Sequence, residues 1–360
     1  MISYLGYFYP QIINESLSSG TGPGIWKTST IVPIEKVNNT IKAEELRPTN
    51  TLASDEKILE LAYLFSQNYH STGKDALVLR ESMEIMAGVL KSAFDFLTSP
   101  SEVPEAYKYL PYHGALLPLV LINIAFVLFC FRIGPWLMRN REPYNLKRVI
   151  RFYNIFQIIY NLVMFSMSCR LILVYIKSPR GFGCIEQLPY DHPFKNFEML
   201  GGYLYLINKF LDYTETVFFI LRKSYKQVTF LHVYHHVMIS TYVFLYLSFQ
   251  GTGGHAALAP MMNTLIHTIM YTYYLMSSLD GNIKKSLWWK KYITQIQLLQ
   301  FVVGTIHQML PLFNDCPFPK FWIYANLFQG VFLLYLFGNF YINIYIKSPK
   351  NKRIKEKKLL

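Results

Sequence analysis

The chain has 360 residues, of which 52% are hydrophobic, 17% aromatic and only 16% charged. Ordinary soluble domains carry about 25% charged residues, so this composition argues against a soluble globular protein. The formal net charge is +13, but the positive residues flank apolar stretches instead of forming one patch, which argues against a nucleic-acid partner.

The first 108 residues differ in character from the rest. They carry 9 Lys and Arg against 13 Asp and Glu, whereas residues 109–360 carry 26 against 9. The segment is rich in Ser, Thr, Asn, Gly and Pro, and it contains no apolar run long enough to cross a bilayer. We expect 1–108 to be an N-terminal extension that is largely disordered, with at most a short amphipathic helix at 55–67, and we assign it no function.

The remainder predicts an all-α membrane protein with seven transmembrane helices. A span needs about 20 mostly apolar residues. Seven stretches qualify: 114–133, 149–176, 199–221, 228–249, 255–279, 292–313 and 321–346. Several contain polar residues, as expected of helices that face one another around a polar interior.

The charges of the connecting segments predict the orientation. The first, third and fifth loops and the C-terminal tail (347–360) together carry 19 Lys and Arg, and the second, fourth and sixth loops carry 4. Positive loops stay in the cytosol. We therefore expect a cytosolic C-terminus and an N-terminus on the opposite side of the membrane.

The chain has four cysteines, and no pair has the CxxC spacing of a zinc site. Cys184 and Cys316 fall in the two longer non-cytosolic loops, a compartment that is oxidising if it is the endoplasmic reticulum lumen. We expect a disulfide between them, with two free thiols as the alternative. Cys130 and Cys169 lie within spans, where cysteine behaves as a small apolar residue.

The strongest chemical signal is the segment HVYHH near the cytosolic start of the fourth span. Its histidines, His232, His235 and His236, occupy positions that share one face of a helix. A lone histidine in a membrane helix is often a packing residue. Three on one face are costly to bury for packing alone, so we interpret them as catalytic.

The third span carries ionisable residues at helical spacing in the segment KFLDYTETVFF. They are Lys209, Asp212 and Glu215, followed by Thr216. Ionisable groups at membrane depth usually pair with one another or face water. A purely structural ion pair is one interpretation; the other is that these residues orient and tune the histidines.

The fifth and sixth spans add further polar residues. The segment NTLIHTIMYTYY places Asn263, His267, Met270, Tyr271 and Tyr274 on one stripe of a helix. The segment TQIQLLQF supplies Gln295, Gln297 and Gln300, which either form interhelical hydrogen bonds or bind a substrate. With the predicted topology, all these motifs converge in the cytosolic half of the bundle, which suits a charged cytosolic headgroup on a long apolar tail.

Taken together, the four motifs resemble those of the ELO family of very-long-chain fatty acid elongases. KFLDYTET resembles the family's Lys-x-x-Glu-x-x-Asp-Thr motif with the two acids exchanged, and HVYHH resembles its histidine box. NTLIHTIMYTYY and TQIQLLQF resemble its Asn-x-x-x-His-x-x-Met-Tyr-x-Tyr-Tyr and glutamine motifs. The likeness extends over about residues 112–346.

The resemblance implies a seven-helix domain at 109–346, in which helices two to seven form a six-helix barrel around a substrate tunnel. It implies condensation of a long-chain acyl-CoA with malonyl-CoA to 3-oxoacyl-CoA, CO2 and CoA, with no bound cofactor or metal. It implies His235 as the nucleophile, assisted by His267 and Asn263. We expect His232, His236 and the third-span residues to position it, and Tyr271, Tyr274 and the glutamines to bind substrate. Membrane lipid and the reductases and dehydratase of the elongation cycle are expected neighbours.

Two other classes of protein remain alternatives. Di-iron desaturases also contain HxxHH, but they need about eight histidines in several boxes. This chain has nine histidines in total and only one box. A seven-span transporter or receptor would also carry intramembrane charges. Lys357 and Lys358 in the tail resemble a retrieval signal for the endoplasmic reticulum, or they are an ordinary basic flank.

Overall fold

The computed structural model describes residues 73–177 and 180–347. In this part of the chain the secondary structure is helical, with turns and without strands. The short helix expected at 55–67, the first 72 residues and the tail from 348 onward, with Lys357 and Lys358, lie outside the described residues.

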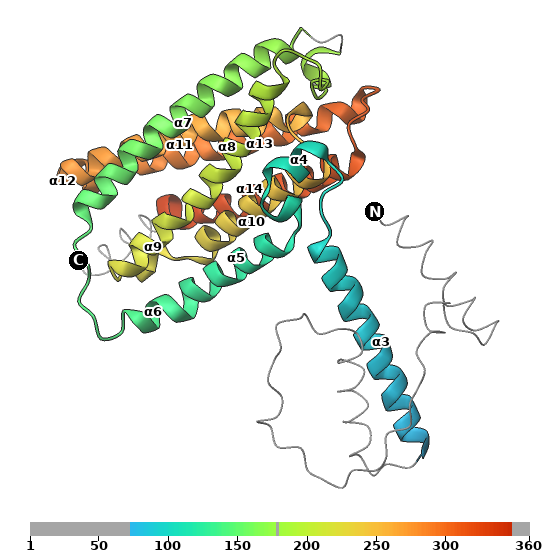
Figure 1. The fold of residues 1–360 in the computed structure, drawn as a ribbon. Helices are drawn as coiled ribbons and strands as arrows, with labels where there is room; N and C mark the ends of the chain where they lie inside the picture. Colours follow the sequence, from blue (N-terminus) through green and yellow to red (C-terminus); the bar gives the residue numbers. More distant parts are fainter. Residues whose placement is uncertain (1–72, 178–179, 348–360) are drawn as a thin grey trace. The chain divides into compact units, whose positions relative to one another are not determined.

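Seven long helical segments lie where the apolar stretches predict them (Figure 1). The chain order is α3 (Gly73–Thr98), α4 (Pro104–Tyr109), α5 (Leu117–Leu128), α6 (Gly134–Leu137), α7 (Lys147–Tyr175), α8 (Lys195–Leu211), α9 (Tyr213–Leu221), α10 (Phe230–Phe249), α11 (Leu258–Leu279), α12 (Gly281–Lys285), α13 (Leu287–Phe313) and α14 (Lys320–Tyr341). A π-helical turn, Phe129–Ile133, joins α5 to α6, and another, Ile342–Lys347, continues α14. Short 3-10 turns occupy Pro111–Gly114, Gly181–Gly183, Tyr225–Gln227 and Gly254–Ala257.

Four of these segments are long and apolar enough to cross a membrane by length and composition: 117–137, 147–175, 288–313 and 320–347. The other three expected spans, α8 with α9, α10 and α11, are those that carry the lysine–acid, histidine and asparagine motifs. Their polar residues lower their hydropathy, and a turn at Asp212 separates α8 from α9. The protein is therefore all-helical with several membrane-spanning helices, and the arrangement of seven spans with a six-helix barrel stays a prediction.

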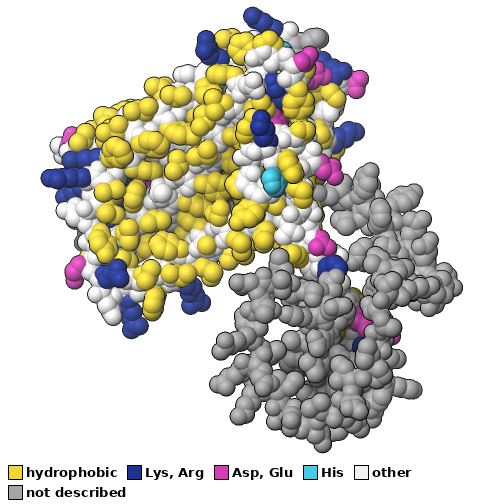
Figure 2. Space-filling view, viewed as in Figure 1, with side chains coloured by type: hydrophobic (Ala, Val, Ile, Leu, Met, Phe, Trp, Pro, Cys, Tyr) yellow, Lys and Arg dark blue, Asp and Glu magenta, His cyan; other side chains and the backbone are white. Residues whose placement is uncertain are grey.

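The surface of the helical unit supports a membrane environment. In Figure 2, apolar side chains cover the middle of the face in view, and Lys and Arg lie toward its two ends, one of which is the end where α6 and α12 lie. Inside, α7 packs along α11 and α13 packs along α14. The exposed apolar surface is suited to contact with the acyl chains of membrane lipids.

The chain divides into two compact units, at residues 1–84 and 85–360. The domain boundary expected at residue 109 stays a prediction, and the second unit contains the helices from α4 to α14. Within it, α4 packs into the core through Ala106, which is fully buried. The reason is a tertiary contact that no local pattern reveals, made by Glu105 of α4.

Glu105 belongs to a buried ionic cluster. Lys195, at the start of α8, lies between two carboxylates: its Nζ is 2.7 Å from Glu198 Oε2 and 3.8 Å from Glu105 Oε1. The backbone N–H of Thr252 donates to Glu105 Oε1 at 2.8 Å, and the Tyr175 hydroxyl donates to Glu198. All five residues are buried. The cluster, which we call the ionic cap, joins α4, α7, α8 and the loop before α11.

Cys184 and Cys316 form a disulfide in the structure, with Cα atoms 5.6 Å apart and a sequence separation of 132 residues. It joins the segment before α8 to the segment before α14, as the loop argument expects. Cys130 is buried and Cys169 half-buried, and both are free thiols.

We predict that Lys195→Met destabilises the protein strongly, because it leaves two buried carboxylates without a cation. Breaking a buried pair in this way costs about 3–5 kcal/mol. The matched control is Arg180→Met, which removes an exposed pair with Glu186 at 2.7 Å and should cost about 1 kcal/mol or less. Thermal unfolding in detergent measures both, and equal shifts in the two variants would contradict the prediction.

Candidate active site

Asp212 is the centre of a buried polar network. It lies at the turn between α8 and α9, and 1% of it is exposed. Its Oδ2 accepts a hydrogen bond from Lys209 Nζ at 2.9 Å, and its Oδ1 accepts from the Tyr271 hydroxyl at 2.9 Å and from Gln157 Nε2 at 3.2 Å. Lys209 also donates to Asn263 Oδ1 at 3.0 Å. A buried ion pair persists where further hydrogen bonds satisfy its remaining atoms, and α7 and α11 supply them.

Gln157 connects α7 to this network. Its side chain has no exposed surface. Its Nε2 donates to Asp212 and to the Tyr153 hydroxyl at 3.0 Å, and its Oε1 accepts from Asn208 Nδ2 at 2.8 Å and from Asn161 Nδ2 at 3.1 Å. One amide therefore satisfies polar atoms on two helices, as fully connected buried networks require.

The three histidines of α10 share one face because they lie three and four residues apart in the helix. The Thr229 hydroxyl caps α10 by accepting from the backbone N–H of His232 at 3.2 Å. The His232 Nε2 atom is 2.8 Å from the Thr216 hydroxyl of α9. The His232 and His236 rings are 4.5 Å apart, and those of His235 and His236 are 5.8 Å apart. The expected histidine cluster therefore exists and packs against the third-span motif.

His267 of α11 faces the same network. Its Nδ1 is 3.8 Å from Asp212 Oδ2, which is too long for a hydrogen bond. His267 is also close enough to His235 and to Lys209 for electrostatic interaction. Within the described residues, the Nδ1 atoms of His235, His236 and His267 are buried and have no hydrogen-bond partner. Buried polar atoms are normally bonded, and among these three imidazoles His235 lines a cavity in which a ligand could supply the missing partner.

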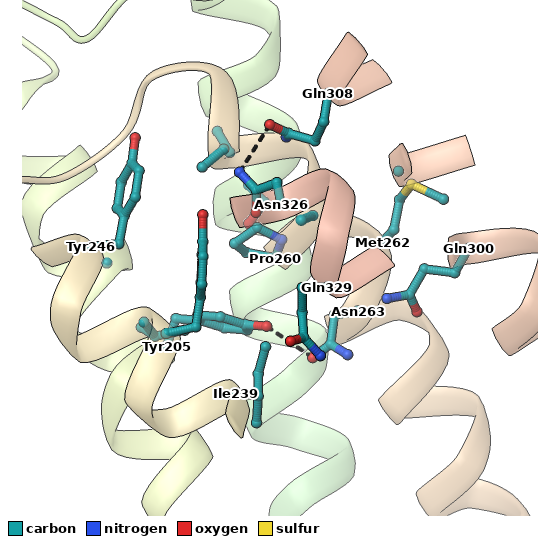
Figure 3. A pocket seen from close by; sticks show the side chains of 18 of the residues that line it. Tyr205, Ile239, Tyr246, Pro260, Met262, Asn263, Gln300, Gln308, Asn326 and Gln329 are labelled. Atoms are coloured by element: carbon teal, nitrogen blue, oxygen red, sulfur yellow. Dashed lines mark hydrogen bonds between the residues drawn. The ribbon is translucent and has the colours of Figure 1, made fainter. Parts of the chain in front are cut away.

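A cavity of about 210 Å³ adjoins His235. Residues of six helices line it: α7, α8, α10, α11, α13 and α14. Figure 3 shows part of the lining, in which Asn263, Gln300 and Gln329 enter from α11, α13 and α14. Most of the other lining residues are apolar or aromatic, such as Met164 and Leu333. A cavity of this composition fits an apolar ligand with one polar end.

The two ends of the cavity differ. His235 lines it near the beginning of α10, whereas Glu198, Tyr175 and Gly253 of the loop before α11 line it at the ionic cap. Gly253 has a φ of 79°, and a Cβ atom there would collide with Glu198 and the Tyr175 hydroxyl. Only glycine fits this position, so the end of the cavity beside the ionic cap is tightly packed.

Comparison with known proteins assigns this arrangement to a family. Residues 111–353, which are more than half of the chain, match the ELO family, described as the GNS1/SUR4 family. The chain belongs to the ELO family. It is 41% identical to very long chain fatty acid elongase F of Drosophila melanogaster over 236 residues, which cover 65% of this chain and 91% of that protein. It is 35% identical to very long chain fatty acid elongase 4 of Mus musculus over 236 residues, covering 65% and 74%.

In this ELO chain, the structure brings together most of the residues that the motifs predict. Lys209, Asp212 and Asn263 form one bonded group, and Thr216 contacts His232. Glu215 is also buried, and the cation that interacts with it electrostatically is Arg222. The exchange of acids relative to the family motif therefore leaves the aspartate, not the glutamate, paired with Lys209.

The expected substrate-binding residues separate into two groups. Gln300 lines the cavity. The Tyr271 hydroxyl instead donates to Asp212, and Gln295 donates to the Tyr341 hydroxyl at 2.8 Å. Tyr274, stacked edge-on against Tyr271, and Gln297 are not among the described cavity-lining residues.

The sequence motifs do not include α7, although its side chains form part of the polar network around Asp212. Gln157, Asn161 and Tyr153 recur at helical spacing in the second span, and polar residues at this spacing in an apolar segment were the available signal. In the part of the chain that the structure describes, no group of three or more His, Cys, Asp and Glu side chains is arranged to hold a metal ion.

We predict that Gln157→Met lowers the stability of the protein by about 1–3 kcal/mol, since it leaves buried partners of the amide unpaired. Elongase activity should fall with it, because Asp212 loses a donor. Asn154→Leu is the control: this buried amide lies one turn away on α7, and its Nδ2 has no partner among the described residues. Thermal unfolding and microsomal elongation assays compare the two, and the prediction fails if Asn154→Leu is the more damaging change.

Proposed function

We propose that the protein is the condensing enzyme of fatty acid elongation. It would join a long-chain acyl-CoA to malonyl-CoA and produce 3-oxoacyl-CoA, CO2 and CoA, without a bound cofactor. The observation that carries this proposal is the position of His235. Its imidazole lines the polar end of a largely apolar cavity, beside a buried lysine–aspartate network.

The first step transfers the acyl group to the enzyme. A neutral imidazole can attack a thioester. The ring nitrogen of His235 forms a bond to the acyl carbonyl carbon, the carbon–sulfur bond breaks, and CoA leaves with the proton that the imidazole loses. No cysteine lines the described cavity, and His235 is the histidine among the residues that line it. We therefore assign the nucleophile to His235.

The second step forms the carbon–carbon bond. Malonyl-CoA loses CO2, and the electron pair of the broken bond forms an enolate of acetyl-CoA. The enolate carbon attacks the acyl group on His235, the carbon–nitrogen bond breaks, and its electron pair stays on the ring nitrogen. The imidazolate takes up one proton from water, which regenerates the neutral imidazole. His267 and Asn263 stabilise the negative charge that develops on oxygen, which is the effect that donors placed at an oxyanion provide.

The neighbouring residues position these groups. Thr216 lies within hydrogen-bond distance of His232 Nε2, and the His236 ring contacts the rings of both His232 and His235. Asp212 orients Lys209 and, through it, Asn263. Glu215 of α9 is a further buried supporting residue. Gln300 and the apolar lining bind the chain, and we propose no metal in the reaction.

The membrane arrangement completes the proposal. Seven spans, with the second to seventh as a six-helix barrel, would enclose the acyl chain and open toward the cytosol for CoA. The C-terminus would lie in the cytosol and the disulfide in the lumen of the endoplasmic reticulum. Long-chain acyl-CoA, malonyl-CoA, membrane lipid and the reductases and dehydratase of the cycle would be the partners, and nucleic acid would not.

We predict that His235→Ala abolishes condensation, because the nucleophile is lost. The protein should remain folded, because the rings that His235 contacts, His236 and Phe337, need no charged partner. Purified enzyme is incubated with long-chain acyl-CoA and labelled malonyl-CoA, and 3-oxoacyl-CoA is measured directly. His192→Ala is the control, since this histidine lies in the loop before α8, outside the cavity. Near-normal activity of His235→Ala would falsify the assignment of the nucleophile.

A further inference from the structure

Two amide side chains on the cavity wall are arranged in the same way. Asn263 of α11 and Gln329 of α14 both line the cavity that His235 lines, and Figure 3 shows them entering it from their two helices. The sequence motifs include Asn263 but not Gln329. What the pair shares is that each side-chain oxygen is already bonded within the protein.

The oxygen of Asn263 is fully occupied. It accepts from Lys209 Nζ at 3.0 Å and from the Tyr205 hydroxyl at 3.1 Å. A carbonyl oxygen has two lone pairs, so these two donors use its accepting capacity. The part of this amide left for a ligand is therefore its Nδ2, which only donates.

The oxygen of Gln329 is held by the histidine box itself. It accepts from the Tyr234 hydroxyl at 3.2 Å. Tyr234 directly precedes His235 on α10, so this bond ties the amide of α14 to the helix of the nucleophile. The Nε2 of Gln329 is buried and has no hydrogen-bond partner within the described residues. A buried donor without a partner is costly, which points to a ligand that accepts from it.

Two other cavity-lining amides nearby, Asn326 and Gln308, do not share this property. Asn326, one turn earlier on α14, donates to Gln308 Oε1 at 3.1 Å, and Gln308 donates to the backbone oxygen of His255 at 3.2 Å. Their donors are used inside the protein. Gln329 therefore differs from its neighbours in having a buried NH2 group available.

We propose that Gln329 is a catalytic residue. Its Nε2 donates a hydrogen bond to the carbonyl oxygen of the acyl group that reacts at His235, opposite the donor of Asn263. When a nucleophile adds to that carbonyl carbon, the π electron pair moves onto the oxygen, and the two amides stabilise the charge without transferring a proton. Tyr234 acts as a positioning residue, because it fixes which end of the Gln329 amide faces the cavity. This inference rests on the proposed condensation.

The test compares variants of the full-length enzyme in detergent, with long-chain acyl-CoA and malonyl-CoA as substrates. Gln329→Leu removes the amide, and Gln329→Glu keeps an oxygen for Tyr234 but replaces the donor by an acceptor. Loss of one oxyanion donor typically lowers kcat about 100- to 1,000-fold. We expect a loss of that order in both variants, with the KM for acyl-CoA changed by about threefold or less, since the interaction strengthens in the transition state.

Two further variants separate chemistry from packing. Tyr234→Phe keeps the Gln329 side chain but removes the hydrogen bond that orients its amide. It should lower kcat less than Gln329→Leu does and leave KM unchanged. Asn154→Leu makes the same chemical change away from the cavity and should leave kcat unchanged. Size-exclusion profiles and thermal midpoints confirm that each variant is folded; if Gln329→Leu aggregates, the nearly isosteric Gln329→Glu decides.

The outcomes distinguish the inference from the proposed function. If the wild-type enzyme releases no 3-oxoacyl-CoA, the proposed function is wrong. If the wild-type enzyme condenses and a folded Gln329→Leu or Gln329→Glu retains kcat within about threefold, the inference about Gln329 is overturned. A rise in KM with unchanged kcat would also overturn it, because that result means ground-state binding only.

Discussion

The burial of a lysine–aspartate pair among membrane helices is the constraint on which the rest of this structure depends. Neither Lys209 nor Asp212 can face lipid, so each must find partners inside the bundle. Those partners are Gln157 of α7 and Asn263 and Tyr271 of α11. These hydrogen bonds bring α7, α8 and α11 together and place His267 beside Asp212. The chemistry of the site and the packing of the bundle thus have a common origin.

Much of this arrangement could be predicted from the sequence. Apolar stretches located the long helices between α5 and α14, four of which are long and apolar enough to cross a membrane. Helical spacing placed the histidines of α10 on one face. Both apolar length and helical spacing are local properties of the chain. The loop argument paired Cys184 with Cys316. The motifs identified Lys209, Asp212 and Asn263, which the structure joins directly.

What the sequence could not predict depends on contacts between distant segments. The local sequence predicts that Glu105 belongs to a polar extension, yet it is buried against Thr252, 147 residues away. Tyr271 reads as a cavity residue, but its hydroxyl bonds to Asp212 instead. Gln329 belongs to no motif, and its hydrogen bond from Tyr234 determines which end of its amide faces the cavity. In each case the partner, not the local pattern, decides the role.

The ionic cap has one more consequence. On the proposed function, an acyl chain that grows at His235 pushes its methyl end toward Glu198 and Gly253. Alkyl side chains can change rotamer to admit another pair of carbons, but paired charges cannot be displaced by a hydrocarbon without losing their partners. The distribution of product sizes should therefore have a sharp upper edge instead of a gradual decline.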